Sequence, residues 1–255
     1  MFTNKFDLVV SMGEDCACAM YLRKSSLRDA SYPFDWLCHA TFERRIECLK
    51  NHFDGFLEKE NMRRLDKPTT GLRDLENDSY EDVNTGFYFY HDFKENVPLD
   101  MAFSEVKSKY NRRIARLYRN VAKSEKVLFV WWSRDKKIDA DTILKSQKIL
   151  SDSFHKPIYL LIFENNNQIE APELSYLSEF VVICKADLVG GTKTTVGNEE
   201  VSLLIFNMIK KKKLMWQKVK FLMWKSIIRI LTLFIPVKKW RKDTRNYLRK
   251  IVGIL

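Results

Sequence analysis

The sequence predicts an α/β fold in which a mostly parallel sheet is flanked by helices, a Rossmann-like arrangement of three layers, followed by a basic amphipathic helical tail. Short apolar runs recur in the second half of the chain, and segments with helical spacing separate them. A further apolar run near the start gives way directly to a helical pattern. Short, nearly continuous apolar runs are typical of parallel strands that are covered on both faces.

The first half of the chain is predicted to supply one strand of this sheet, two helices and an aromatic strand. Val-rich apolar sequence predicts the first strand, and apolar residues at helical spacing predict the second helix. A charged segment rich in Asp, Asn and Gly predicts an excursion from the fold or a long loop. In order, these elements are a strand at Phe6–Met12, a helix at Cys16–Lys24, a helix at Phe34–Leu57, a loop over residues 58–86 and a strand at Gly86–Phe93.

The second half is predicted to alternate helices with buried strands. Its first helix has a basic face, and the strands that follow are compact apolar runs. No internal repeat is visible. The predicted helices are Glu105–Val121, Ala140–Ser151 and Asn198–Ile209, and the predicted strands are Val127–Trp132, Ile158–Phe163 and Phe180–Cys184.

Positive charge is concentrated at the end of the chain. The 255 residues have a formal net charge of +11, yet residues 207–255 hold 15 Lys or Arg and a single acid, Asp243. The rest of the chain is therefore mildly acidic. A nucleic-acid-binding protein more often spreads basic residues over its folded domain, so nucleic acid is not an expected partner. We expect one α/β domain, residues 1–206, followed by the tail, residues 207–255.

The tail interleaves Lys and Arg with Trp, Phe, Ile and Leu. Its longest nearly uncharged run, Ile230–Val237, is far shorter than the about 20 apolar residues that a membrane-spanning helix needs. Basic and aromatic side chains beside aliphatic ones suit a helix lying in the surface of an anionic membrane. The sequence therefore predicts a cytoplasmic protein held on the inner face of the cytoplasmic membrane by residues 210–255. A solvated, partner-binding or nucleic-acid-binding tail is the alternative.

The five cysteines predict free thiols. Their number is odd, and no secretory signal precedes them. The one Cys-x-Cys pair, at residues 16 and 18, has no second metal-spaced pair to complete a zinc site, so we expect no metal and no cofactor. The cysteines are Cys16, Cys18, Cys38, Cys48 and Cys184.

Cys16 is the candidate nucleophile, with a small structural cysteine as the alternative. It stands where the first strand gives way to the first helix, and backbone N–H groups at a helix N-terminus favour a thiolate. Functional residues of such sheets gather beyond the carboxyl ends of the strands. Polar residues follow all four predicted strands: Ser11, Gly13, Glu14 and Asp15 after the first, Ser133, Arg134 and Asp135 after the second, Glu164 and Asn165 after the third, and Lys185 and Asp187 after the fourth.

Motifs over residues 5–165 resemble a bacterial family of uncharacterised function labelled as papain-like cysteine peptidases. The Pro-Phe-Asp-Trp block is the most specific of them. The papain-type sequence Cys-Gly-x-Cys-Trp is missing. In order, the motifs are Ser11-x-Gly13-x-x-Cys16, Leu27-Arg28, Pro33-Phe34-Asp35-Trp36, His91-Asp92-Phe93 and the pair Arg112-Arg113.

The resemblance implies a hydrolase with Cys16 as its nucleophile. Such an enzyme needs a histidine to take the thiol proton and a group to orient it. His91 is the predicted acceptor. Asp35 is the predicted orienting residue, because Asp92 is adjacent to His91 on a strand and should face the other side. The other histidines are not expected in the site: His39 and His52, on the helix Phe34–Leu57, are predicted to be surface or packing residues, and His155, in a turn before Pro157, is predicted to be structural.

Two enzymatic functions and one non-enzymatic function are therefore predicted as alternatives. The first is a cysteine-dependent hydrolase using Cys16 and His91 at the membrane face. The second is a transferase of surface-polysaccharide or lipopolysaccharide assembly, the gene setting of many family members, which binds a phosphorylated or nucleotide-linked sugar and has a structural Cys16. The third is a membrane-tethered scaffold. The predicted substrate-binding residues are Ser11, Gly13, Arg28, Trp36, Asp92, Arg112 and Arg113.

Overall fold

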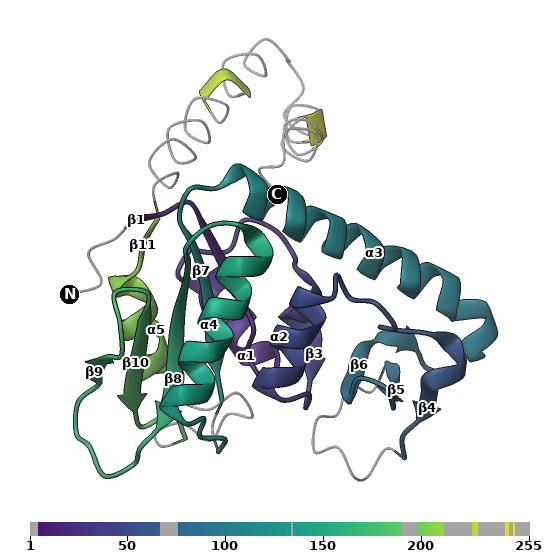
Figure 1. Cartoon of the computed structure of the whole chain (residues 1–255). Coiled ribbons are helices and arrows are strands. Elements are labelled where there is room, and N and C mark those ends of the chain that lie inside the picture. Colours follow the sequence, from purple (N-terminus) through teal and green to yellow (C-terminus); the bar gives the residue numbers. More distant parts are fainter. Residues whose placement is uncertain are drawn as a thin grey trace. The chain divides into compact units, whose positions relative to one another are not determined.

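The described part of the chain combines a central, mostly parallel sheet with a smaller antiparallel sheet (Figure 1). The computed structural model describes residues 5–66, 76–133, 135–189 and 198–211, together with residues 226–228, 243–244 and 247. The chain divides into two units, residues 1–211 and 212–255, and the elements named below belong to the first. The predicted tail therefore lies almost entirely outside the described residues. Among the described residues, every helix is too short or too polar to be a bilayer-crossing segment.

The central sheet has the strand order β2-β7-β8-β10-β9. Its first four strands are parallel, and β9 pairs antiparallel with β10 at one edge. This arrangement confirms the α/β prediction and places the four predicted apolar strands in one sheet. The strands are β2 (Leu8–Ser11), β7 (Val127–Trp132), β8 (Ile158–Asn165), β9 (Glu173–Tyr176) and β10 (Val181–Ala186).

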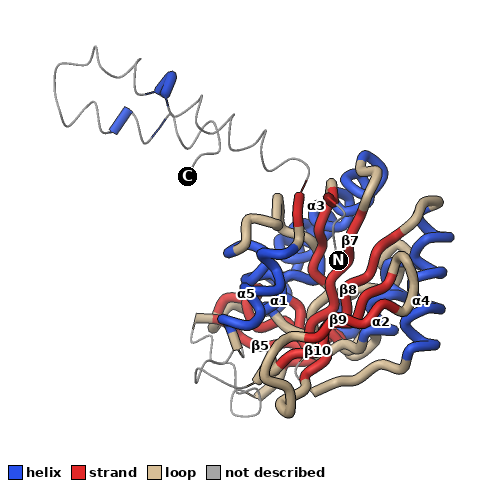
Figure 2. Tube along the Cα trace, turned by 90° about the vertical axis from the view of Figure 1, so that its left-hand side faces the viewer, coloured by secondary structure: helices blue, strands red, loops and turns tan. Residues whose placement is uncertain are grey.

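Helices cover both faces of this sheet (Figure 2). Side chains alternate between the two faces, so Val10 packs into one hydrophobic core while its neighbour Val9 packs into the other. Helices α1 and α5 contribute to the core around Val9, and α2, α3 and α4 to the core around Val10. The helices are α1 (Cys16–Lys24), α2 (Phe42–Lys50), α3 (Leu99–Lys123), α4 (Ala140–Phe154) and α5 (Glu199–Met208).

The antiparallel sheet has the order β3-β6-β5-β4 and packs beneath α3 (Figure 1). Its longest strand, β6, bulges in the middle: Phe89 pairs with Tyr80 and Phe93 with Asp78, so three residues of β6 stand opposite one of β5. His91 is the central residue of this bulge. The strands are β3 (Leu37–Cys38), β4 (Met62–Arg64), β5 (Asn77–Asp82) and β6 (Phe87–Lys94).

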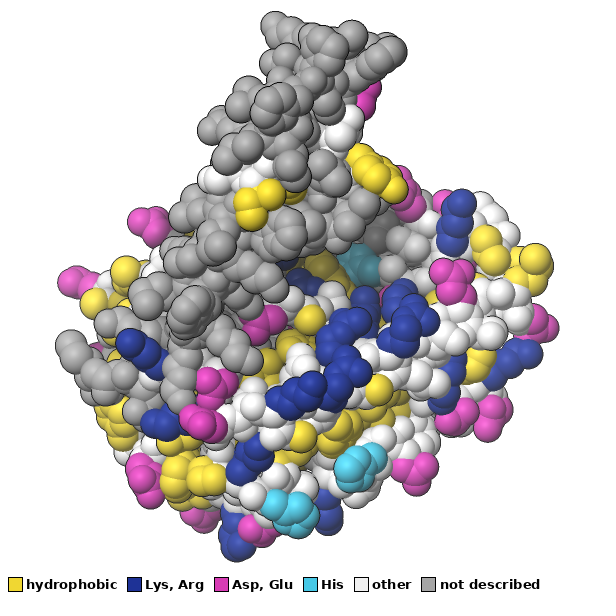
Figure 3. Space-filling model, turned by 90° about the horizontal axis from the view of Figure 1, so that it is seen from above, with side chains coloured by type: hydrophobic (Ala, Val, Ile, Leu, Met, Phe, Trp, Pro, Cys, Tyr) yellow, Lys and Arg dark blue, Asp and Glu magenta, His cyan; other side chains and the backbone are white. Residues whose placement is uncertain are grey.

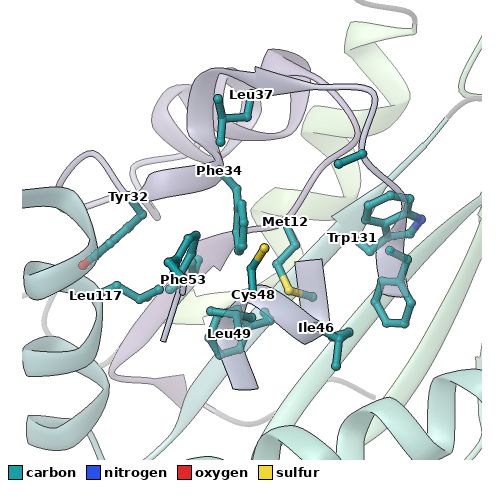
Figure 4. Packing of buried hydrophobic residues seen from close by; sticks show 14 of the residues in the cluster. Met12, Tyr32, Phe34, Leu37, Ile46, Cys48, Leu49, Phe53, Leu117 and Trp131 are labelled. Carbon is teal, nitrogen blue, oxygen red and sulfur yellow. The ribbon is translucent and has the colours of Figure 1, made fainter. Parts of the chain in front are cut away.

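The Pro-Phe-Asp-Trp block is anchored in the core by Phe34 (Figure 4). The Phe34 ring lies 5.2 Å from that of Phe53 and 5.7 Å from that of Phe87. Full burial of a phenylalanine contributes about 2–3 kcal/mol. Met12, which follows β2, belongs to the same core. The block is thereby fixed beside the carboxyl end of β2.

The predicted helix over Phe34–Leu57 is wrong at both ends. Pro33–Trp36 is a 3₁₀ helix and Leu37–Cys38 is β3, so α2 covers only the middle of the predicted range. His39, between β3 and α2, has φ 71°, and His52, after α2, has φ 52°. These left-handed residues cannot continue a helix. The apolar residues have helical spacing because successive short elements pack into one core.

Two further predictions need correction. Residues 58–86 are not a single loop, because β4 and β5 lie within them. The first strand is interrupted at Asp7, whose carboxylate accepts the backbone N–H groups of Glu125 and Lys126 at 3.0 Å each. The short β1 (Lys5–Phe6) before this break pairs with β11 (Lys210–Lys211) rather than with β7.

Candidate functional site

Cys16 is the first residue of α1, at the carboxyl end of β2, as predicted. Asp15 caps this helix, because its carboxylate accepts the Ala17 backbone N–H at 2.8 Å. Cys16 itself is 7% exposed. An acidic cap neutralises part of the positive end of a helix. The helix N-terminus therefore gives the thiol less electrostatic support than the sequence alone predicts.

Ser11 and Gly13, predicted to bind substrate, shape the turn before Cys16. The buried Ser11 hydroxyl accepts the Gly13 backbone N–H at 3.2 Å. A Cβ atom on Gly13 would lie 2.4 Å from the Cβ of Cys18. Only glycine allows the first turn of α1 to pack this closely on the loop that precedes it. Both residues thus set the position of Cys16.

The turn after β3 runs beside the turn before α1. The Cys38 sulfur accepts a hydrogen bond from the backbone of Cys16. The backbone N–H of His39 donates to the Glu14 carbonyl at 3.1 Å. These two contacts bring residues 38–39 alongside residues 14–16, although more than twenty positions separate them in the sequence.

Arg45 of α2 holds these turns together from inside the protein. Its side chain is fully buried, and its guanidinium donates to the carbonyls of Ala40, Leu37 and Glu14 at 3.2–3.4 Å. The guanidinium also lies over the rings of Phe34, Phe87 and Trp131, at 4.9–5.8 Å from their centroids. Burial lowers the pKa of Arg45 to about 10, so the group remains charged at neutral pH. Arg45 is thus a cation enclosed by carbonyls and aromatic faces.

His39 projects from its turn onto two tyrosines of β6. Its ring lies 4.2 Å from the ring of Tyr88, and Nε2 is 3.0 Å from the Tyr90 hydroxyl. The prediction of a packing or surface histidine on a helix is therefore wrong in its location. We call Glu14, Cys16, Cys38, His39 and Tyr90 the thiol cluster.

Glu14 connects the thiol cluster to the loop after β7. Lys136 forms an ion pair with the Glu14 carboxylate at 2.6 Å and also donates to the His39 carbonyl at 3.0 Å. Burial favours a higher pKa for Glu14, but the hydrogen bonds from Lys136 and Ser133 lower it overall. Burial, followed by the Lys136 ammonium, lowers the pKa of His39 below its usual value. Glu14 is therefore ionised and His39 neutral at neutral pH.

The other four cysteines lie in environments that keep thiols protonated. Burial raises the pKa of each, to about 12 for Cys18, Cys48 and Cys184 and higher for Cys38. Thiols buried without a partner that takes their proton are chemically inert. In the described part of the chain, no three His, Cys, Asp or Glu side chains are placed to hold a metal ion together.

A second group of polar residues surrounds the Pro-Phe-Asp-Trp block. Arg28 pairs with the Asp35 carboxylate at 2.8 Å, and the Tyr32 backbone N–H donates to the same oxygen at 3.0 Å. Even so, burial raises the pKa of Asp35 to about 6, above its ordinary 3.8. Asp35, predicted to orient His91, is thus bonded to Arg28 and to the backbone of its own turn.

Trp36 and His91 lie next to this ion pair. Their rings are 5.7 Å apart, and the Arg28 guanidinium lies 5.8 Å from the Trp36 ring centroid. Arg113 of α3 stacks on Tyr110 at 5.0 Å and lowers the pKa of Asp35 electrostatically. Within the described residues, Asp35 Oδ1 and Arg113 Nη1 have no hydrogen-bond partner. We call Arg28, Asp35, Trp36, His91 and Arg113 the arginine cluster.

The two remaining predicted residues occupy different surroundings. The buried Asp92 carboxylate accepts the Tyr110 hydroxyl at 2.7 Å and pairs with Lys109 at 2.5 Å, so it joins β6 to α3. Arg112 is exposed on the outer side of α3. The structure thus gathers Arg28, Asp35, Trp36, His91 and Arg113, and places Ser11 and Gly13 beneath Cys16.

Three members of the thiol-cluster region were missed by sequence reasoning. His39 lies within the predicted helix Phe34–Leu57, and Arg45 lies in the same range, where a basic residue of an amphipathic helix usually faces solvent. Tyr90 stood out only as part of an aromatic run. A sequence signal for this turn is the pair Cys38-His39, which only Leu37 separates from the Pro-Phe-Asp-Trp block.

Comparisons with known proteins agree with the motif resemblance. Residues 7–156 match the model of a family described as "Putative papain-like cysteine peptidase (DUF1796)". An uncharacterized protein of Acanthamoeba polyphaga mimivirus is 29% identical over 176 residues, which cover 64% of this chain and 74% of the viral protein. Because that relative is a viral protein, the comparisons do not support the expectation that the family is bacterial. No solved structure matches. The chain belongs to the family described as papain-like cysteine peptidases.

Proposed function

We propose that the protein is a cysteine-dependent hydrolase with Cys16 as its nucleophile. The observation that carries this proposal is the position of Cys16 at the start of α1, at the carboxyl edge of a parallel sheet, beside a turn that carries a histidine. The peptidase description of the family supports the same class of reaction. The other four thiols are suppressed by burial.

In the proposed reaction the Cys16 sulfur attacks the carbonyl carbon of an amide or ester. The bond to the leaving group breaks, and the leaving amine or alcohol takes the proton that the thiol has given to a histidine. Water then hydrolyses the thioester and restores the thiol. His39 and His91 are the two candidates for the histidine, on the turn after β3 and on the bulge of β6 respectively.

We propose the arginine cluster as the place where an anionic part of the substrate binds. Arg28 is occupied by Asp35, whereas Arg113 keeps a nitrogen without a partner among the described residues. A guanidinium with free N–H groups is suited to a carboxylate or a phosphate. Arg113→Gln should then raise KM for an anionic substrate and leave KM for a neutral one unchanged.

The transferase alternative has one feature in its favour, the basic outer side of α3. Figure 3 shows a band of Lys and Arg side chains on this face of the molecule. No acid occurs between Val106 and Lys123. Such a band suits a phosphorylated or nucleotide-linked sugar. The members exposed or half-exposed on α3 are Lys107, Lys109, Arg112, Arg113, Arg116, Arg119 and Lys123.

Location at the membrane face remains a proposal that rests on sequence composition. Residues 210–255 combine most of the excess positive charge with Trp and aliphatic residues. Deleting residues 212–255 should release the protein from anionic vesicles in a sedimentation assay. Equal sedimentation of the truncated and full-length proteins would contradict this proposal.

The hydrolase proposal is tested with an activated ester such as p-nitrophenyl acetate and the full-length protein. We expect turnover through an acetyl group on Cys16, which mass spectrometry of peptide fragments can locate. Cys16→Ser should abolish turnover with little change in the free energy of unfolding, because the substitution is nearly isosteric. Cys48→Ala, on the buried side of α2, is the matched control and should retain turnover per folded molecule. Full activity of Cys16→Ser would overturn the proposal.

A further inference from the structure

We propose that His39, on the turn after β3, is the residue that accepts the Cys16 proton, and that Tyr90 holds the His39 ring in place for this step. This inference rests on the proposed role of Cys16 as a nucleophile. It replaces His91, which the sequence motif favours, by a histidine from a different turn.

The first argument is the contact between the two turns. The His39 backbone N–H is bonded to the carbonyl of Glu14, and the sulfur of the preceding residue, Cys38, is bonded to the backbone of Cys16. Arg45 donates to carbonyls on both turns and fixes their spacing. These contacts place the His39 turn alongside the start of α1, and His39 itself is exposed.

The second argument is that Cys16 needs a proton acceptor. A thiol at a helix N-terminus can ionise without one if the terminal N–H groups are free. Here Asp15 takes the Ala17 N–H, and the Cys16 backbone is bonded to the Cys38 sulfur. Cys38 remains a neutral thiol because burial raises its pKa. The nearby charge is therefore the negative carboxylate of Asp15, which disfavours a thiolate.

The third argument is the protonation state of His39. The charged groups that face it are Glu14 and Asp15 before α1, and Asp135 and Lys136 after β7, while Tyr88 and Tyr90 of β6 contribute neutral rings. Burial and Lys136 outweigh the three carboxylates and lower the pKa of His39. A neutral imidazole is the form that can accept a proton.

Tyr90 supplies the orientation that such a base requires. Burial raises the pKa of Tyr90, so its hydroxyl remains protonated and can both donate and accept. We assign a hydrogen bond from His39 Nε2–H to the Tyr90 oxygen, across the observed 3.0 Å. This tautomer leaves the lone pair of Nδ1 free to take the Cys16 proton. Stacking on Tyr88 restricts the remaining rotation of the ring.

The backbone at His39 offers a clean test. Its φ of 71° lies in the left-handed region, which asparagine tolerates well, so His39→Asn removes the imidazole and preserves the turn. The matched control is His52→Asn, because His52 also has a positive φ, 52°, and also stacks on a tyrosine, Tyr118 at 4.6 Å. The third variant is His91→Asn.

The experiment measures the rate at which iodoacetamide alkylates Cys16 in each full-length variant, with mass spectrometry of peptide fragments to identify the site. We expect His39→Asn to slow alkylation at neutral pH by about tenfold or more and to displace its pH profile to higher pH. His52→Asn should react like the unmodified protein. Tyr90→Phe, which keeps the imidazole but removes its partner, should slow alkylation by a smaller factor.

The outcomes separate this inference from the proposed function. If Cys16 reacts rapidly and His91→Asn slows it while His39→Asn does not, the inference is overturned and the hydrolase proposal survives. If Cys16 of the unmodified protein reacts no faster than Cys48, both fail.

Discussion

The thiol cluster and the arginine cluster differ in how their polar groups are paired. In the arginine cluster, charges are buried against each other: Arg28 and Asp35 form an ion pair whose side chains are 9% and 1% exposed. In the thiol cluster, His39 is neutral and exposed, and its two strongest ionised neighbours, Lys136 and Glu14, are paired with each other. The first arrangement fixes charge in place, whereas the second leaves neutral groups able to exchange protons.

This difference is consistent with separate roles for the two clusters. Buried ion pairs contribute little net stability because desolvation offsets their attraction, so they serve best to orient groups. A proton acceptor for Cys16 must lie beside it, and the His39 turn is bonded to the turn that carries Cys16. We therefore associate the thiol cluster with chemistry and the arginine cluster with the position of an anionic substrate.

The largest expected effect on stability comes from Arg45, whose guanidinium supports the turns of the thiol cluster. Arg45→Met should lower the free energy of unfolding by about 3–5 kcal/mol, because it removes the donor to the carbonyls of Leu37 and Ala40 and one of the two donors to the Glu14 carbonyl. Urea denaturation measures this change. Arg44→Met, on the exposed side of the same helix, breaks only the surface pair with Glu47 and should cost less than about 0.5 kcal/mol. Equal effects of the two variants would refute the clamping role of Arg45.

The next largest effect is the pH dependence of stability that Asp35 of the arginine cluster produces. The folded protein holds the Asp35 proton up to about pH 6, whereas the unfolded chain releases it near the ordinary value of 3.8. In this window the folded state binds more protons, so the contribution of Asp35 to stability falls as pH rises, by about 3 kcal/mol in total. Asp35→Asn removes this dependence.

Chemical denaturation at several pH values measures this change. The free energy of unfolding of the unmodified protein should fall relative to that of Asp35→Asn between about pH 4 and about pH 6. If the free energy of unfolding of the unmodified protein instead rises with pH relative to that of Asp35→Asn, the attraction of Arg28 for the Asp35 carboxylate outweighs the cost of burying its charge. The arginine cluster would then favour a charged Asp35.

A smaller effect is expected at Gly13, beneath the thiol cluster. Gly13→Ala places a methyl group 2.4 Å from the Cys18 Cβ and should cost about 2 kcal/mol through overpacking. Gly86→Ala is a useful contrast: nothing lies within 4 Å of the added methyl, but φ is 71°, so about 1 kcal/mol of backbone strain is expected. Only Gly13→Ala should also alter the alkylation rate of Cys16.

The sequence was informative where structure is local. Continuous apolar runs identified the strands β7, β8 and β10, and the change from apolar run to helix located the start of α1 at Cys16. Within the Pro-Phe-Asp-Trp motif, Phe34 anchors the block in the core, while Asp35 and Trp36 join the arginine cluster.

The thiol cluster was not predictable in the same way, because long-range contacts assemble it. The contact of His39 with Glu14 depends on the pairing of β3 with β6 and on the hydrogen bond from Arg45 to Glu14, all between residues distant in sequence. Helical spacing over Phe34–Leu57 concealed the left-handed turn at His39, since three short elements share one core. Periodicity reports which residues are buried, and it cannot distinguish one long helix from several short elements that bury the same side.

The most direct test of the central claim, that Cys16 is the reactive thiol, compares all five cysteines of the unmodified full-length protein in one experiment. The protein is treated with iodoacetamide under native conditions at neutral pH, and peptide mass spectrometry gives the alkylation rate at each position. We predict that Cys16 reacts at least about a hundred times faster than Cys18, Cys38, Cys48 or Cys184, whose thiols burial keeps protonated. Comparable slow rates at all five positions would contradict the account.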